Sequence, residues 1–226
     1  MDVVEVIKSR KSIRAFKPDP VPLDTLKQII GLAVRAPSWS NTQPWEFVIA
    51  GGRDLKAIES KSVERDEQDQ APDIARAEEF PEPYNTRRRG LTPMLLEIKG
   101  IKREDKEGRR WWRMQGERHF GAPVVIYVCI ARALYFQKNG INSWPLFDCG
   151  LVSENIMLLA AAYGLGTIVQ ARAAYHPDIV REVLRIPDSK LVVMGISVGY
   201  PDWDDPVNQL HSEREPLENV VTWRVT

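Results

Sequence analysis

The run Ala122-Pro-Val-Val-Ile-Tyr-Val-Cys-Ile-Ala131 constrains the fold of this 226-residue chain more than any other segment. Its apolar residues follow one another almost without interruption, over the length of one strand. A strand of this kind presents apolar side chains on both faces, so both faces must be covered. The run therefore predicts the centre of a sheet that has helices packed on both sides.

The rest of the chain alternates between helical and extended patterns. Apolar residues repeat at helical spacing after Asp24 and again after Asp148, and each of these aspartates is a suitable N-cap. The expected helices cover residues 3–9, 24–34, 55–62, 148–163 and 177–184, and the expected strands cover residues 45–50, 122–131, 167–170 and 190–200. The connections between strands differ greatly in length, and no Gly-x-Gly-x-x-Gly follows a strand. We therefore predict an α+β fold with a central mixed sheet, and no Rossmann site.

A segment dense in charge and proline interrupts this pattern at residues 63–118. It contains the run Arg87-Arg88-Arg89 and the pair Trp111-Trp112. A flexible linker is one interpretation, but the aromatic residues favour helices that pack on the body. We interpret the segment as a variable insertion in a single domain that spans residues 1–226.

Composition narrows the range of partners. The 31 basic and 31 acidic residues cancel, so no global field attracts nucleic acid or an anionic membrane. The N-terminus reads as an amphipathic helix and not as a signal peptide, and no apolar run approaches the roughly 20 residues of a membrane span. Cys129 and Cys149 form neither a metal-binding spacing nor a redox pair. We expect buried free thiols in a cytoplasmic protein that has no nucleic-acid or membrane partner.

Three cations and a hydroxyl gather within five residues near the N-terminus. They are Arg10, Lys11, Ser12 and Arg14. A phosphate carries about two negative charges and several acceptor oxygens, which match the planar donor fork of arginine and the neutral donor of serine. The alternative is a solvated basic turn whose cations interact with the C-terminus of the first helix.

A polar loop, Ala36-Pro-Ser-Trp-Ser-Asn-Thr-Gln-Pro-Trp45, separates the second helix from the first strand. Its hydroxyl, amide and indole groups are concentrated between two prolines, as is typical of a ligand-binding loop. The candidate binding residues are Pro37, Ser38, Trp39, Asn41 and Gln43. The alternative is a helix stop followed by a turn whose polar side chains bond to local backbone, with Trp45 in the core.

These two motifs, together with Arg214-Glu-Pro-Leu217 near the C-terminus, resemble the nitroreductase family of flavin enzymes. The resemblance covers nearly the whole chain and is weakest in the charged insertion. It implies bound flavin mononucleotide (FMN), whose phosphate and ribityl chain contact the basic motif and whose N1–C2 carbonyl edge lies near Arg14. It also makes Arg214 a further phosphate ligand. Many relatives have another cation where this chain has Ser212.

The same resemblance implies an obligate homodimer. Family members use the Pro-Ser-x-x-Asn-x-Gln-Pro-Trp stretch to contact the flavin that is bound mainly by the other subunit. Pro37, Ser38, Asn41 and Gln43 match this stretch, whereas Trp39 stands at a variable position and contacts ring or substrate, or packs in the core. In the family, backbone after the Gly164-Leu-Gly166 element lines the flavin near N5. The resemblance therefore makes Val169, Gln170 and Ala171 candidate contacts of the flavin.

The implied activity is a ping-pong transfer of electrons from NADH or NADPH, through the flavin, to a small aromatic acceptor such as a nitroaromatic or a quinone. Pro83-Tyr84, the three arginines at 87–89 and the ending Arg214-Glu-Pro-Leu-Glu-Asn-Val-Val-Thr-Trp223 look closest to the nitrobenzoate- and nitrobenzene-reducing branch. No side chain is assigned a chemical step, because the cofactor carries the chemistry and His119, His176 and His211 lie in unrelated contexts.

Two alternatives remain open from the sequence. The same scaffold also hosts other flavin chemistry, such as reductive dehalogenation or enoate reduction. A non-enzymatic FMN-binding module is the alternative from another class. The sequence distinguishes neither NADH from NADPH nor one physiological acceptor from another.

Overall fold

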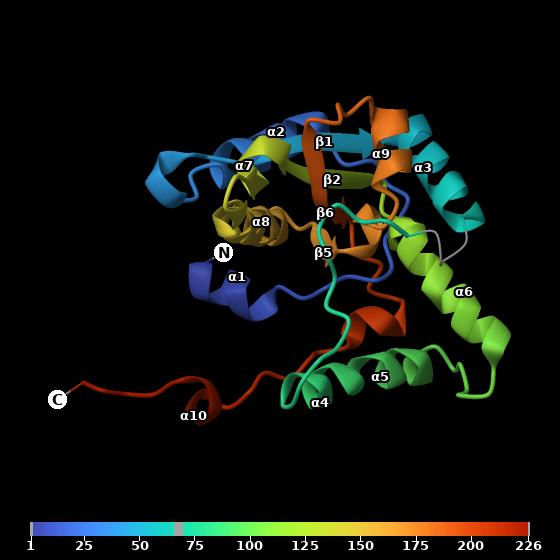
Figure 1. The fold of residues 1–226 in the computed structure, drawn as a ribbon. Helices are drawn as coiled ribbons and strands as arrows, with labels where there is room; N and C mark the ends of the chain where they lie inside the picture. Colours follow the sequence, from blue (N-terminus) through green and yellow to red (C-terminus); the bar gives the residue numbers. More distant parts are fainter. Residues whose placement is uncertain (1, 66–69, 226) are drawn as a thin grey trace.

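The computed structural model describes residues 2–65 and 70–225, and its centre is a sheet of four strands (Figure 1). In spatial order these are β1 (Glu46–Gly51), β2 (Val124–Ala131), β6 (Lys190–Gly199) and β5 (Gly166–Gln170). Each strand is antiparallel to its neighbours, and a parallel bridge from Ser12 to Thr167 makes the β5 edge mixed. The apolar run forms β2, as predicted, and β2 is buried from Val124 to Ile130.

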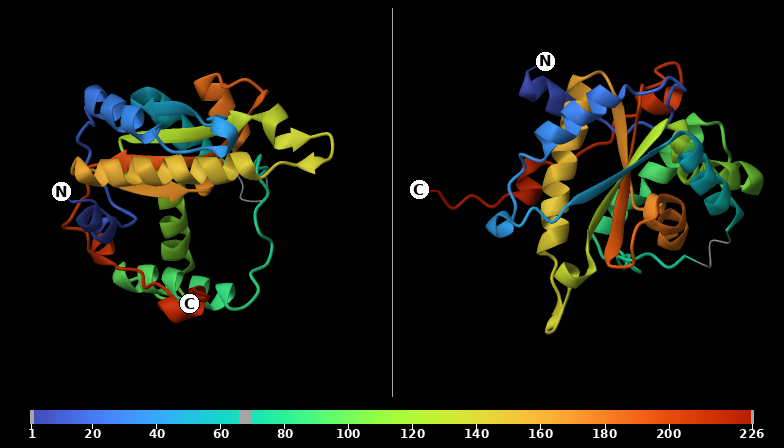
Figure 2. Two further views of the ribbon diagram at one scale, coloured as in Figure 1. Left: turned by 90° about the vertical axis from the view of Figure 1, so that its left-hand side faces the viewer. Right: turned by 90° about the horizontal axis from the view of Figure 1, so that it is seen from above.

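Helices cover both faces of the sheet, which confirms the expected α+β architecture. One face packs against α2 (Leu23–Ala33) and α8 (Trp144–Ala162), and the other against α3 (Gly52–Glu64) and α9 (Pro177–Leu184). The right-hand view of Figure 2 shows the sheet nearly edge-on between these layers. Successive β2 side chains point to opposite faces, so Ile126 joins the core under α8 while Tyr127 joins the core under α9.

The two predicted aspartate N-caps are wrong. α2 begins at Leu23, so Asp24 lies inside its first turn. α8 begins at Trp144, four residues before Asp148, because Pro145 fits the first turn of a helix, where its missing N–H is no loss. Asp148 is therefore a buried residue of α8, and its carboxylate accepts a hydrogen bond from the Trp39 backbone N–H at 3.1 Å.

The charged segment at 63–118 folds mainly into helices, although its residues 66–69 lie outside the described part of the chain. It contributes α4 (Tyr84–Arg89), α5 (Leu91–Ile98) and α6 (Lys106–Glu117). Leu95 of α5 and Trp112 of α6 pack with Val207 near the C-terminus. The extended residues 70–80 are attached to the sheet by Asp73, which accepts a hydrogen bond from Val192 N at 2.7 Å and pairs with Arg181.

The remaining elements are short, apart from the N-terminal helix. They are α1 (Val3–Ser9), α7 (Arg132–Tyr135), α10 (Leu217–Val220), the hairpin strands β3 (Phe136–Gln137) and β4 (Gly140–Ile141), and the 3₁₀ turns η1 (Trp39–Asn41), η3 (His119–Gly121), η4 (Arg172–Ala174) and η5 (Pro206–Gln209). After α10 the chain leaves the body as an extended tail (Figure 1).

α8 is a core helix with a second apolar face. By length and composition, this 19-residue helix is the one described helix that is apolar enough to cross a membrane. Cys149, Val152 and Ile156 are fully buried against the sheet, which is typical of a core helix. Trp144 and Phe147 on the opposite side are exposed. One layer of structure therefore covers only part of α8.

Ile126→Ala should lower the free energy of unfolding by about 3 kcal/mol, because it leaves a cavity in the middle of the sheet. Ile126 is 0% exposed, whereas its cross-strand partner Ile49 is 42% exposed. Ile49→Ala is therefore the matched control, and its expected cost is less than about 1 kcal/mol. Urea denaturation of both variants measures the difference, and equal losses would contradict the assigned core.

Candidate functional site

The basic motif at residues 10–14 is an extended segment attached to the outer edge of β5. The Ile13 backbone N–H donates to the Thr167 carbonyl at 3.0 Å, and the Ile13 side chain is buried. A Cβ on Gly166 would lie 2.5 Å from Ile13 Cγ1, so this close approach requires glycine. Because Ile13 points into the body, its neighbours Ser12 and Arg14 point the other way along the extended chain.

Asn208 holds this segment from the other side, and sequence reasoning missed it. Asn208 is 0% exposed, its Oδ1 accepts from Arg14 N at 2.7 Å, and its Nδ2 donates to the Ala15 carbonyl at 2.7 Å. The amide thus satisfies backbone groups of a segment that lies 194 positions earlier. A lone asparagine in a polar tail carries no sequence signal for such a role.

Arg14 is a half-buried cation that lacks an acidic partner. Burial lowers the pKa of its guanidinium, and its Nη1 donates only to the Ser12 carbonyl, at 3.3 Å. None of the described carboxylates forms an ion pair with it. A partly desolvated charge without a counterion is unfavourable by itself. An anionic or strongly polar ligand at this position would therefore be stabilised.

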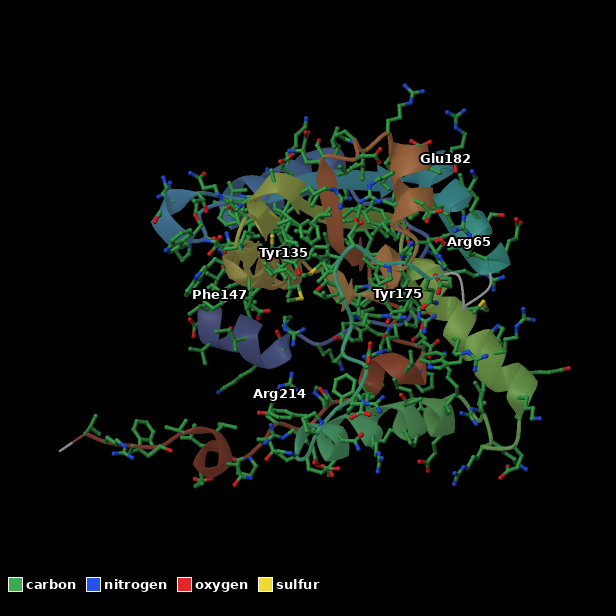
Figure 3. All side chains as sticks on the ribbon, viewed as in Figure 1. Arg65, Tyr135, Phe147, Tyr175, Glu182 and Arg214 are labelled. Atoms are coloured by element: carbon green, nitrogen blue, oxygen red, sulfur yellow. The ribbon has the colours of Figure 1, made fainter. Side chains whose placement is uncertain are left out.

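The structure brings the segment just before the C-terminal motif next to Lys11. Lys11 Nζ lies 3.3 Å from His211 Nε2 and 5.1 Å from the centre of the Trp203 ring, and burial lowers the pKa of Lys11. Arg214 Nη1 donates to Ser212 Oγ at 2.8 Å, and Figure 3 shows Arg214 between α1 and the layer of α4 and α10. Arg10 makes only a long ion pair with Glu154, at 3.9 Å.

The outer edge of β5 continues past the basic motif as open backbone. The Thr167 carbonyl faces this edge, so the backbone groups of Val169, two residues later, face it too. β5 ends at Gln170, and the Ala171 carbonyl accepts from Ala174 N at 2.9 Å in the η4 turn. Of the described strands, none pairs with this edge of β5. Gln170 is different, because its Oε1 accepts from Ser197 Oγ at 2.6 Å and its Nε2 donates to the Gly116 carbonyl. The Gln170 side chain is therefore buried and links β5 to β6 and to the end of α6 through hydrogen bonds.

The polar loop at 37–45 has an unusual backbone. Ser40, Asn41 and Gln43 all have positive φ, at 49°, 56° and 46°, and none of them is glycine. The Ser38 hydroxyl accepts from Gln43 N at 2.9 Å, and Gln43 Nε2 donates to Asn41 Oδ1 at 3.2 Å. Three strained residues so close together are typical of a functional loop.

Two aromatic residues of the loop differ in their surroundings. Trp45 is buried in the core, as expected if the loop is a helix stop followed by a turn. Trp39 is 52% exposed and stacks on Trp144 of α8 with ring centres 6.2 Å apart. Core packing is therefore excluded for Trp39 within one chain. Pro37, Asn41 and Gln43 are exposed as well.

The loop and the basic motif do not meet within one chain. The loop contacts the start of α8 at Trp144 and Asp148. The basic motif contacts Glu154 and then the strand after α8. Asp148 and Glu154 alone are about 9 Å apart along a helix axis. The basic motif therefore contacts α8 near its middle, whereas the loop of the same chain contacts the N-terminal end of α8.

A cleft of ≈ 920 Å³ opens beside the β5–η4 junction. Ala171 and Tyr175 line one wall, and Arg76, Phe80 and Arg88 of the charged segment line the other. Arg76 and Arg172 stack on the Tyr175 ring at 4.3 and 5.3 Å, a cation–π arrangement. Figure 3 shows Tyr175 beside this segment. Aromatic and guanidinium walls suit a planar or anionic guest.

The three histidines do not converge. His119 is buried and its Nε2 lies 3.4 Å from the Tyr127 hydroxyl, whereas His211 is exposed beside Lys11. Across residues 2–65 and 70–225 no cluster of His, Cys, Asp and Glu could hold a metal ion. Burial lowers the pKa of His119 to about 4, despite a hydrogen bond with Gln170 that raises it. His119 is thus a neutral structural residue.

His119 should make the fold acid-sensitive. Its folded-state pKa of about 4 lies below the ordinary value of 6.5, so only the unfolded chain takes up the proton between these pH values, and stability falls as pH falls from 6.5 to 4. Between pH 6.5 and pH 4, the free energy of unfolding of His119→Gln should fall by up to about 3 kcal/mol less than that of wild type. Urea denaturation at several pH values measures the difference. His211→Gln, at an exposed histidine, is the control. A variant slope equal to that of wild type would refute the assignment.

Comparison with known proteins agrees with these motifs. The model of the Nitroreductase family matches residues 7–200. Chloronitrobenzene nitroreductase of Comamonas testosteroni is 33% identical, over 97% of this chain and 95% of the relative. The 4-nitrobenzoate reductase of Nocardioides sp. is 31% identical, over 96% of this chain and 88% of the relative.

Solved structures show the same relationship. The FMN- and NADPH-dependent nitroreductase NfnB of Sphingopyxis superposes with a TM-score of 0.92 at 28% identity, with both chains fully covered. NfnB of Mycobacterium smegmatis, solved in complex with NADPH, gives 0.90 at 28% identity, over 99% of this chain and 98% of that one. The resemblance that the motifs at residues 10–14, 37–45 and 214–217 indicated is confirmed: this chain belongs to the nitroreductase family.

Proposed function

We propose that the chain is an FMN-dependent oxidoreductase that passes electrons from NAD(P)H to nitroaromatic or quinone acceptors. The observation that carries the proposal is Arg14, a half-buried cation without an acidic partner, at the start of an open strand edge. The relatives that act on chloronitrobenzene and 4-nitrobenzoate, and the FMN-dependent structural neighbours, support it.

The described residues fit FMN. Arg10, Lys11, Ser12 and Arg214 would hold the phosphate and ribityl chain, because they offer cationic and hydroxyl donors around one place on the surface. Arg14 would face the pyrimidine edge of the ring, where its charge favours uptake of electrons. The open backbone of Val169 and the exposed residue Ala171, which follows the end of β5, would line the ring. FMN supplies the two-electron carrier, and the protein supplies position and field.

The acceptor would enter through the cleft beside Ala171. Its Tyr175 and Phe80 rings offer apolar walls for a planar acceptor, and Arg76 and Arg88 offer cationic donors. No observation favours reductive dehalogenation, enoate reduction or a non-enzymatic role. The relatives with more than 30% identity are named for nitro reduction.

The enzyme would be a homodimer whose subunits complete each other's flavin sites, working in the cytoplasm. Val3, Val4 and Ile7 of α1 and Trp144 and Phe147 of α8 are exposed large apolar residues. The left-hand view of Figure 2 shows both helices on the same face of the molecule. Single exposed apolar residues are ordinary, but several large ones on two neighbouring helices of one face are typical of an interface. Trp39 adjoins the patch through its stack on Trp144.

The C-terminal tail favours the same arrangement. Leu217, Val220 and Trp223 are exposed, and the tail leaves the body without packing on it (Figure 1). Apolar residues on such a tail are stabilised when they cover a partner's surface. A partner would also bring its strained loop, with Asn41 and Gln43, to the basic motif that its own chain does not reach.

A variant that combines Arg10→Ala with Arg214→Ala should bind FMN about 100-fold more weakly, because each substitution removes one charge-assisted hydrogen bond from a guanidinium to the phosphate. Wild-type protein should be yellow, and NADH or NADPH should bleach it under anaerobic conditions until 4-nitrobenzoate is added. Fluorescence titration with FMN measures the affinity. The control is Arg53→Ala, since the Arg53 side chain is almost fully exposed. Colourless wild-type protein without FMN affinity would refute the proposal.

Two inactive variants should complement each other when mixed. One variant carries Arg10→Ala with Arg214→Ala, and the other carries Asn41→Ala with Gln43→Ala. If subunits exchange freely, half of the dimers are mixed and each has one site with both parts intact, so about one quarter of wild-type activity should return. Activity after co-refolding measures this. If the activity of the mixture is no greater than the summed activities of the two separate variants, both motifs belong to the site of a single chain.

A further inference from the structure

A second cavity, which the flavin site does not use, lies along α5. Its volume is ≈ 960 Å³, and its apolar floor includes Pro93, Leu96 and Ile101. Five cationic side chains surround this floor: Arg88, Arg89, Lys102, Arg103 and Arg109. We call it the basic cavity. It lies within the charged segment at 63–118, whose role the sequence left open.

The charge of the basic cavity is unbalanced. Glu97 is the one acidic residue in its lining. None of the five cations lies within 4.0 Å of a described carboxylate oxygen, although the charge of Arg89 helps to lower the pKa of Glu82. Arg88 stacks on Phe80 at 4.6 Å, and Arg109 Nη1 donates to the Arg103 carbonyl at 3.1 Å. The whole chain has no net charge. Five cations around one concave surface therefore produce a local positive potential that attracts anions.

The basic cavity adjoins the cleft beside the predicted flavin contacts. Arg88 lines both, and the cleft also includes Ala171 and Tyr175. An elongated ligand can therefore place one end beside Ala171 and the other among the arginines. An acceptor with a single aromatic ring is too short to use both spaces, whereas a dinucleotide has two separate ring systems joined by a diphosphate.

We propose that the basic cavity binds the 2′-phosphorylated adenosine end of NADPH, so that the enzyme prefers NADPH to NADH. The inference rests on the proposed function, since it assumes that the nicotinamide end lies over a flavin beside Ala171. The 2′-phosphate is the group that distinguishes the two nucleotides, and arginine accommodates it by paired charge-assisted hydrogen bonds. Guanidinium planes and the apolar floor would also cover the adenine.

Arg103 and Arg109 provide the test, because they line the basic cavity but not the cleft. Arg103→Gln and Arg109→Gln should each lower kcat/KM for NADPH about tenfold, through KM, the effect of removing one charge-assisted hydrogen bond. The kcat/KM for NADH should not change. Arg53→Gln is the matched control, an exposed arginine on α3. FMN content and thermal midpoint should match wild type.

A direct binding measurement complements the kinetics. Adenosine 2′,5′-bisphosphate should compete with NADPH for the wild-type holoenzyme, and this inhibition should weaken in both cavity variants, whereas adenosine 5′-monophosphate should inhibit weakly throughout. Equal wild-type kcat/KM for NADH and NADPH, or equal losses with both nucleotides in the variants, would overturn the NADPH assignment and leave the oxidoreductase in place. Failure of both nucleotides to reduce the flavin would overturn the proposed function itself.

Discussion

The rest of the structure depends on the burial of β2 between two helical layers. β2 is apolar on both faces, so α2 and α8 must cover one face of the sheet and α3 and α9 the other. β6 pairs with β2, and β5 pairs with β6 at the edge of the sheet. The free edge of β5 is the result, and the basic motif attaches to that edge through Ile13 and Thr167.

The candidate site therefore depends mainly on how the fold positions its binding groups, and no side chain in it is assigned a chemical step. Asn208 orients the segment that carries Arg14, and Gly166 permits its close approach. The charged segment at 63–118 is held on the body at two points. Asp73 accepts a hydrogen bond from Val192 N of β6, and Trp112 packs against Val207 near the C-terminus. Such a frame suits an enzyme in which a cofactor performs the chemistry.

The apolar outer face of α8 has a consequence for assembly. A helix that is apolar on more than one side must be covered on more than one side. Within one chain the cover is incomplete, because Trp39, Trp144 and Phe147 stay exposed at one end of α8. The same end carries the strained loop, so the apolar face and the separation of loop and basic motif lead to one proposal, a site shared between two chains.

Local patterns in the sequence determined the element types, the β2 core and the family, because periodicity and short motifs act over a few residues. The two aspartate caps were misplaced, since Pro22 is the N-cap of α2 and Pro145 lies in the first turn of α8. Tertiary structure alone decided that Asn208 clamps residues 14 and 15, that the Gln170 side chain turns inward, and that the loop lies away from the basic motif. These outcomes depend on contacts between residues far apart in the chain. Such contacts exist only when the sheet has brought those residues together.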